Sequence, residues 1–232
     1  IAEEIQDLLR RHDEELQART PFRARISKAG GDAIILFIGW FACAGLLWLL
    51  QPGFLRDRPA VLLFLTITTV TLALSKWSVV SILLKNSLPV YSPYLMMPVA
   101  LAPMLAVILS GRVPALAAGF WTAFAASIYA QYSIGVFASG FASTILLLHA
   151  TGRFRTRRRI MEVGIWIGGV SALCTIGGAL IHEAPAIIIL QYAGISLACG
   201  FIVALITLLL LPVLELVFGI TTDISLLELC DM

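Results

Sequence analysis

Long apolar runs, separated by short segments that contain proline, glycine or charge, make up most of this chain. A helix needs ~20 apolar residues to cross the hydrocarbon core of a bilayer. Seven runs approach that length: roughly 32–51, 60–80, 91–109, 113–132, 134–150, 162–182 and 188–211. The pattern therefore predicts an all-α, polytopic transmembrane helix bundle of about seven spans. Only a short segment at Ser133 separates the fourth and fifth runs, which leaves the number of spans across residues 113–150 open.

The composition agrees with the membrane class. The chain has 232 residues, of which 59% are hydrophobic and 13% charged, whereas soluble domains are about 25% charged. Seven of the 14 acidic residues lie at or before Asp32, and none lies between Ala60 and Met161. The four cysteines have no metal-ligand spacing and are interpreted as small hydrophobic residues. We therefore expect a water-exposed start and a lipid-embedded middle.

The first 28 residues differ from the rest of the chain. Apolar residues recur at helical spacing from Ile1 to Leu16 with charges between them, which predicts an amphipathic helix that ends or kinks at Thr20-Pro21. This stretch lacks the apolar core of an export signal. It also lacks a helix start signal, so we interpret it as the continuation of a helix. We interpret residues 1–28 as the end of an extracytoplasmic domain and its stalk, and we expect the chain to be part of a longer protein.

Arginine and lysine residues in the loops predict the orientation, because cytoplasmic loops carry an excess of them. With the N-terminus outside, eight lie on each side, so the count alone is a tie. Arg10 and Arg11 lie far from the first span, whereas one short loop beside two spans carries five arginines: Arg153, Arg155, Arg157, Arg158 and Arg159. These five favour an outer N-terminus and a cytoplasmic C-terminus; an even number of spans would overturn this.

Few residues could support catalysis. His12-Asp13 has the letters of an HD metal site, but such a site needs more histidine and aspartate ligands. The other histidines, His149 and His182, lie at the ends of predicted spans. No carboxylate occupies the middle of a span, which argues against an ion-coupled transporter. We assign no catalytic, cofactor-binding or metal-binding residue to this chain.

Lys76 and three prolines are the intramembrane features with a functional interpretation. Lys76 is a functional candidate inside the second span, or else it snorkels to the outer interface. Pro93, Pro98 and Pro103 recur every five residues in "VYSPYLMMPVALAPML". Prolines bend a membrane helix and free backbone carbonyls, so this stretch is a candidate mobile helix or else an inert kink.

Small residues recur every four positions, a spacing that lets helix backbones approach closely. Packing within one bundle explains such residues more often than dimer formation does, although a homodimer stays open. The repeats are Gly164 and Gly168; Gly135, Ser139 and Ser143; and Gly194 and Ala198.

The C-terminal stretch "LPVLELVFGITTDISLLEL" has the features of a junction between a membrane bundle and a following domain. Leu211-Pro212 is predicted to close the last span, Gly219 can cap a helix in the left-handed conformation, and Ser225 to Glu228 has the form of a capping box. An interfacial helix without a partner is the alternative. The proposed coupling residues are Pro212, Glu215, Gly219, Thr222, Asp223, Ser225 and Glu228.

That junction, the proline-rich segment "YSPYLMMPVALAPML" and the "RFRTRRR" loop before an apolar span together resemble the seven-transmembrane receptors with an intracellular HD hydrolase. The resemblance covers about residues 29–232 and is most specific at the junction. It implies an extracytoplasmic sensing domain before the bundle (29–211), then a linker (212–232) and a cytoplasmic HD domain. That domain hydrolyses a cyclic dinucleotide, cyclic di-AMP in the studied members, at a site with two divalent metal ions.

The resemblance makes this chain the membrane sensor and transmission region of such an enzyme, without catalysis of its own. Its implied partners are the lipid bilayer, its own outer and HD domains and an unknown outer ligand, with no nucleic acid. The implied location is the bacterial inner membrane. Two alternatives stay open: a small-molecule transporter or permease, and a passive membrane anchor.

Overall fold

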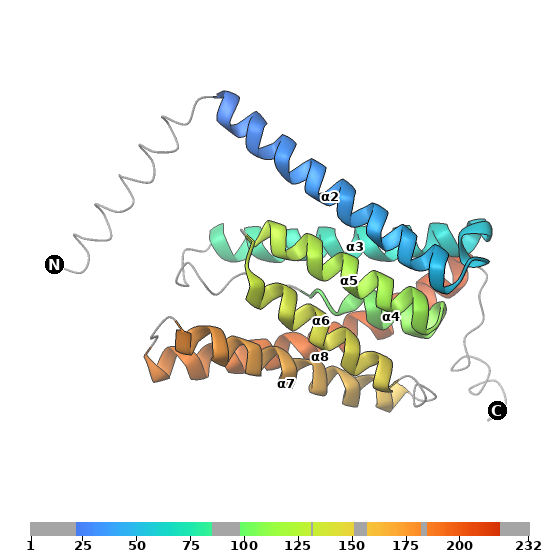
Figure 1. Cartoon of the computed structure of the whole chain (residues 1–232). Coiled ribbons are helices and arrows are strands. Elements are labelled where there is room, and N and C mark those ends of the chain that lie inside the picture. The colour runs from blue at the N-terminus through green and yellow to red at the C-terminus, as the bar shows by residue number, and fades with distance from the viewer. Residues whose placement is uncertain (1–21, 85–97, 131, 151–156, 182–184, 219–232) are drawn as a thin grey trace. The chain divides into compact units, whose positions relative to one another are not determined.

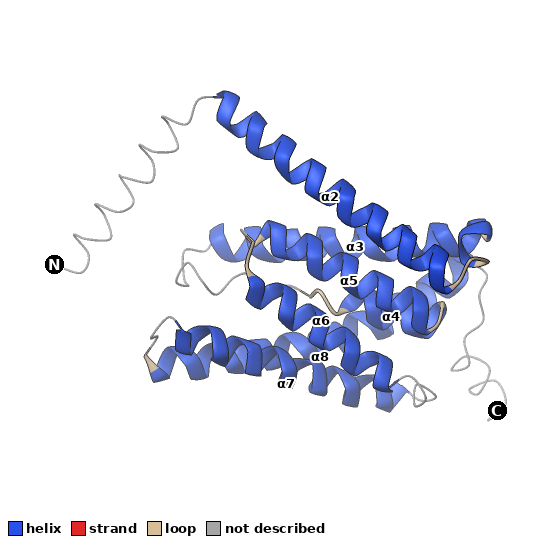
Figure 2. Cartoon of the chain, viewed as in Figure 1, coloured by secondary structure: helices blue, strands red, loops and turns tan. Residues whose placement is uncertain are grey.

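The computed structural model describes residues 22–84, 98–130, 132–150, 157–181 and 185–218, with backbone only for 22–29, 55 and 79–84. These residues form seven α-helices and one 3-10 helix, without a strand (Figures 1 and 2). The all-α prediction is therefore confirmed. The elements are α2 (Phe22–Leu50), η1 (Phe54–Arg56), α3 (Arg58–Leu84), α4 (Leu101–Leu109), α5 (Arg112–Tyr129), α6 (Ile134–Ala150), α7 (Arg157–Ile181) and α8 (Ala186–Phe218).

Four of these helices contain stretches long and apolar enough to cross a membrane: Gly30–Leu50, Arg58–Ser78, Arg157–Ile181 and Ala186–Phe218. The protein is therefore a multi-pass membrane protein. Residues 113–150, where the sequence left the number of helices open, form the separate helices α5 and α6. Tyr132 turns the chain between them with a φ of 64°. The helix predicted for residues 1–18 lies outside the described part of the chain.

The chain divides into two compact units, residues 1–40 and 41–232. The described part of the first unit is the first half of α2, which exposes Ile34, Phe37 and Ile38. The second unit holds the end of α2 and all the helices from α3 to α8. The geometry below belongs to the second unit.

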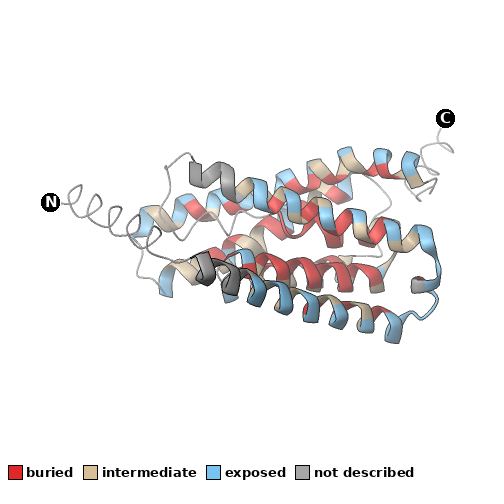
Figure 3. Cartoon of the chain, turned by 90° about the horizontal axis from the view of Figure 1, so that it is seen from above, coloured by how far each residue is buried: buried red, intermediate tan, exposed pale blue. Residues whose placement is uncertain are grey.

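Helix α4 lies at the centre of the second unit. All residues from Leu101 to Val107 are buried, and α4 contacts α3, α5, α6 and α8. The surrounding helices bury one face and expose the other, as the alternating colours along their ribbons show (Figure 3). Lipid tails are as apolar as the protein core, so burying apolar side chains does not by itself hold membrane helices together. The helices around α4 are therefore held by close packing.

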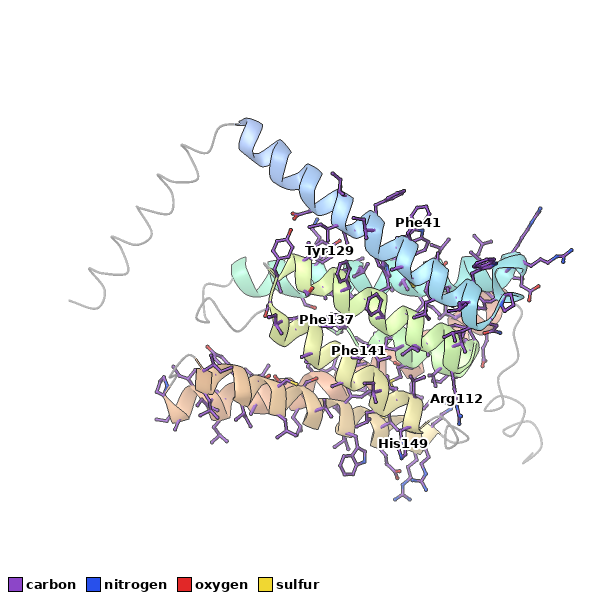
Figure 4. The ribbon with its side chains drawn as sticks, viewed as in Figure 1. Phe41, Arg112, Tyr129, Phe137, Phe141 and His149 are labelled. Atoms are coloured by element: carbon purple, nitrogen blue, oxygen red, sulfur yellow. The ribbon has the colours of Figure 1, made fainter. Side chains whose placement is uncertain are left out.

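Helices α3, α5 and α7 begin at one end of this unit, where α6 and α8 end (Figure 1). Arg112 at the start of α5 and His149 at the end of α6 lie together at this end, and Tyr129 lies at the opposite one (Figure 4). We call it the arginine end, after the arginines at or next to the starts of α3, α5 and α7: Arg56, Arg58, Arg112, Arg157, Arg158 and Arg159.

The structure adds detail at two predicted boundaries. The third span was predicted across 91–109; its described part is a turn at residues 98–100 followed by α4, which has nine residues and is about 14 Å long at 1.5 Å per residue, while residues 91–97 lie outside the described part of the chain. The last span was predicted to close at Leu211-Pro212, and the helix α8 itself continues through Pro212 to Phe218, next to the predicted cap residue Gly219.

Candidate functional site

The turn that leads into α4 is buried, non-helical backbone within the described part of the chain. Pro98, Val99 and Ala100 are all buried, and the Leu101 amide donates to the Pro98 carbonyl at 3.1 Å. The Val99 carbonyl lies 3.4 Å from Thr122 Oγ1 on α5. Non-helical backbone at membrane depth is tolerated where protein or a cavity covers it, and here four neighbouring helices provide that cover.

The proline prediction needs correction at this turn. Pro98 precedes α4 instead of bending it. Pro103 occupies the first turn of α4, where an amide has no helical acceptor, so proline is tolerated without a kink. Pro93 lies outside the described residues. The described part of the segment is therefore a turn followed by a short straight helix, and motion of this segment stays a prediction.

A small cavity adjoins the turn. Its lining includes residues 98–100, Ser139 and Ser143 on α6, Ser171 on α7 and Cys199 on α8, and its volume is about 20 Å³. That is room for one water molecule. The Ser139 and Ser143 hydroxyls donate to the carbonyls of Val136 and Ser139 in their own helix, at 3.0 and 2.7 Å. Their remaining lone pairs give the cavity a polar wall, but the volume is too small for a metabolite.

The closest helix contact in the unit joins α7 to α8. A Cβ built on Gly168 would lie 2.6 Å from the Leu197 carbonyl oxygen, and one on Gly164 would lie 2.5 Å from the Ala204 Cβ. A Cβ on Gly200 would overlap the Gly168 backbone and lie 2.6 Å from the Gly164 carbonyl oxygen. Glycine at these three positions allows the two backbones to touch.

One side-chain hydrogen bond reinforces the α7–α8 pair. The hydroxyls of Thr175 and Ser196 lie 2.8 Å apart, and both side chains are buried. The Thr175 hydroxyl also lies 2.8 Å from the Ser171 carbonyl, to which it donates. Ser196 therefore supplies the hydrogen between the two hydroxyls. Close backbone contact and this bond make α7 and α8 one packed unit.

A second pair of helices, α5 and α6, is held in a similar way. A Cβ on Gly119 would overlap the Thr144 side chain, and one on Gly140 would lie 2.9 Å from both Ala123 Cβ and Val99 Cγ1. On the outer side of this pair, Phe120 meets Phe137 edge to face with ring centroids 6.2 Å apart. The turn before α4 is thus packed against α6 as well as α5.

Lys76 is exposed and does not face the bundle interior. It lies 18 residues after Arg58 on α3, about 27 Å along the helix axis at 1.5 Å per residue. Arg112 and Tyr129 on α5 are separated by about 26 Å on the same basis. Both distances are close to the ~30 Å hydrocarbon core. This spacing supports the alternative in which Lys76 snorkels to the interface opposite the arginine end.

The arginine cluster begins α7. Arg158 Nε lies 3.3 Å and Arg159 Nη1 lies 2.8 Å from the two carboxylate oxygens of Glu162. Their side chains are 89% and 52% exposed, so these pairs are surface interactions of small net stability. Arg157 is also exposed. Arg153 and Arg155 lie outside the described residues.

The coupling junction is described only in part. Pro212 is exposed and Glu215 is half-buried, both within α8. The other predicted junction residues lie outside the described part of the chain: Gly219, Thr222, Asp223, Ser225 and Glu228. Within the described residues no group of three histidine, cysteine, aspartate or glutamate side chains could hold a metal ion.

The sequence interpretation missed the partners in these contacts. It named Gly164 and Gly168 but not Gly200, which packs against both. It also named Gly194, which has nothing within 4 Å of its added Cβ. An antiparallel comparison of small residues along adjacent spans could have found Gly200. Nothing in the sequence pointed to Thr122 as the partner of the turn.

The sequence model of one family, described as "7TM receptor with intracellular HD hydrolase", matches residues 27–222, which is most of the chain. No curated protein and no solved structure matches.

Proposed function

The chain belongs to the family of seven-transmembrane receptors with an intracellular HD hydrolase, and on that premise we propose that its bundle transmits an outer signal to such a hydrolase. In this proposal the bundle changes its packing when the outer domain binds its ligand. The change moves the start of the junction after α8 and thereby alters hydrolysis of a cyclic dinucleotide, cyclic di-AMP. The signal runs inward through the membrane, with the C-terminus cytoplasmic.

The observation that supports this role is the continuity of α8. The helix runs for 33 residues from Ala186 to Phe218 and includes Pro212. Its buried stripe contacts α7 through Gly200 and α4 through the central core. A long helix that is packed against its neighbours from Tyr192 to Leu214 and leads on to residues 219–232 converts a packing change into a displacement.

An insertion series in the full-length protein tests transmission through α8. Each alanine inserted between Glu215 and Leu216 turns the following chain by about 100° and advances it by about 1.5 Å. Two alanines rotate the output by about 200°, whereas seven add nearly two whole turns. We expect two alanines to change the basal rate of cyclic di-AMP hydrolysis in nanodiscs, and seven to restore most of the original rate.

The outcomes separate transmission from a passive anchor. Equal rates at every insertion length would show that the bundle does not set the orientation of the hydrolase. Cyclic di-GMP, assayed beside cyclic di-AMP, tests the proposed substrate. Chelation followed by return of Mn²⁺ tests the two metal ions proposed for the HD domain, because di-metal hydrolysis stops without them.

A further inference from the structure

The arginine end of the second unit carries a surplus of positive charge. Among the described residues from 41 to 218, the arginine end holds the six arginines after which it is named. It also holds three carboxylates: Asp57, Glu162 and Glu215. Six positive and three negative charges leave a net charge of +3. The only other ionisable lysine or arginine in this described part is Lys76, near the opposite interface.

The positions of these arginines within their helices add to the positive potential. Helices α3, α5 and α7 start with Arg58, Arg112 and Arg157, and none has an acidic residue in its first turn. The N-terminal end of a helix carries a partial positive charge, which a nearby cation reinforces. On α7, Arg158 and Arg159 share the single carboxylate of Glu162. The three arginines at the start of α7 therefore outnumber the Glu162 carboxylate with which two of them pair.

An apolar outer face follows directly along α7. Ile165 and Trp166 are 50% and 68% exposed, and Leu173 is 70% exposed. Ile165 lies about 9 Å along the axis from Arg159 at 1.5 Å per residue. A side chain at the start of α7 thus reaches the headgroup level while the next two turns face the acyl chains. A positive end followed by an apolar face matches the two parts of an amphiphile, an anionic headgroup and apolar acyl chains.

We propose that the start of α7 binds the phosphate of an anionic phospholipid headgroup, with Arg157, Arg158 and Arg159 as its ligands. Guanidinium groups present paired donors that match phosphate oxygens. The continuous apolar face selects a membrane lipid over a soluble phosphate, because the acyl chains then stay in contact with α7. This site is independent of the signalling role proposed above.

The test uses the intact 232-residue chain in nanodiscs that contain equal amounts of phosphatidylcholine and phosphatidylglycerol. After extraction into detergent, native mass spectrometry measures the ratio of the two lipids that remain bound. We expect the variant R157Q/R158Q/R159Q to lower phosphatidylglycerol retention at least threefold. The control variant Lys76→Gln, which removes one charge near the opposite interface, should leave the ratio and its salt dependence unchanged.

Two further arms keep the result interpretable if the triple glutamine variant folds poorly. Raising salt from 50 to 500 mM should reduce phosphatidylglycerol retention by the original protein, because exposed charges are screened. Excess glycerol 3-phosphate should not displace the lipid. Equal retention by the original protein and a folded triple variant, salt-independent retention, or displacement by glycerol 3-phosphate would overturn the proposal.

Discussion

The contact between α7 and α8 predicts opposite effects for two glycine-to-alanine substitutions on one helix. In Gly200→Ala, the new Cβ would lie 2.6 Å from the Gly164 carbonyl oxygen and overlap the Gly168 backbone. Backbone atoms cannot rotate away as a flexible side chain does. Reaching an ordinary contact of 3.4 Å with the Gly164 oxygen alone requires about 0.8 Å of separation, and the closer Gly168 backbone requires α7 and α8 to separate further.

The magnitude follows from two opposing terms. Overpacking of a close contact costs about 1–3 kcal/mol, while replacing glycine by alanine inside a helix gains up to about 1 kcal/mol. Gly194 on α8 has nothing within 4 Å of its added Cβ, so Gly194→Ala keeps only the gain. We therefore expect Gly200→Ala to destabilise the fold by about 1–2 kcal/mol and Gly194→Ala to leave it unchanged or slightly more stable.

Reversible unfolding in mixed micelles of increasing SDS content, followed by tryptophan fluorescence, measures this difference. Gly169→Ala is the matched control on α7, because nothing lies within 4 Å of its added Cβ either. The reasoning fails if Gly200→Ala and Gly194→Ala unfold at the same SDS fraction, since the backbones would then not be in contact.

Two further predictions concern single sites. Gly111, the residue before α5, has a φ of 95° and a ψ of −169°, a conformation that costs an alanine about 1–3 kcal/mol. Gly111→Ala should therefore lower the apparent melting temperature, while Gly53→Ala, at a φ of −69°, should not; equal temperatures would contradict this. Thr175→Val removes one partner of the buried hydrogen bond to Ser196. A double-mutant cycle with Ser196→Ala should give a coupling free energy of about 0.6 kcal/mol, the average for such bonds in membranes. A coupling of zero would mean that the two hydroxyls do not interact.

Helix α5 has the composition of a helix that neighbouring helices shield from lipid. Helix α5 is not among the four clear span candidates, yet Arg112 and Tyr129 lie at its two ends and opposite ends of the unit. Most of its residues are buried by neighbouring helices. A helix covered by protein does not need lipid-compatible side chains, so its small and polar residues are consistent with a buried position.

Apolar run length was a reliable guide where a helix faces lipid. The described helices α2, α3, α7 and α8 follow the predicted runs because lipid-facing side chains must be apolar and the backbone must satisfy its own hydrogen bonds. The same rule did not predict the turn that precedes α4. An apolar run containing Pro98 and Pro103 reads as one bent span, but all of its described residues to Val107 are buried, and burial by protein permits a turn there.

The sequence by itself determined the class and the family of this protein, while the structure separated residues 113–150 into α5 and α6. The class and the family depend on composition and local periodicity, which the bilayer constrains strongly. The tertiary structure decided which small residues matter. Gly164, Gly168 and Gly194 occupy similar positions in the pattern, yet only the first two meet a partner, Gly200. That partner lies on another helix, and a contact between segments distant along the chain leaves no local signal in the sequence of either one.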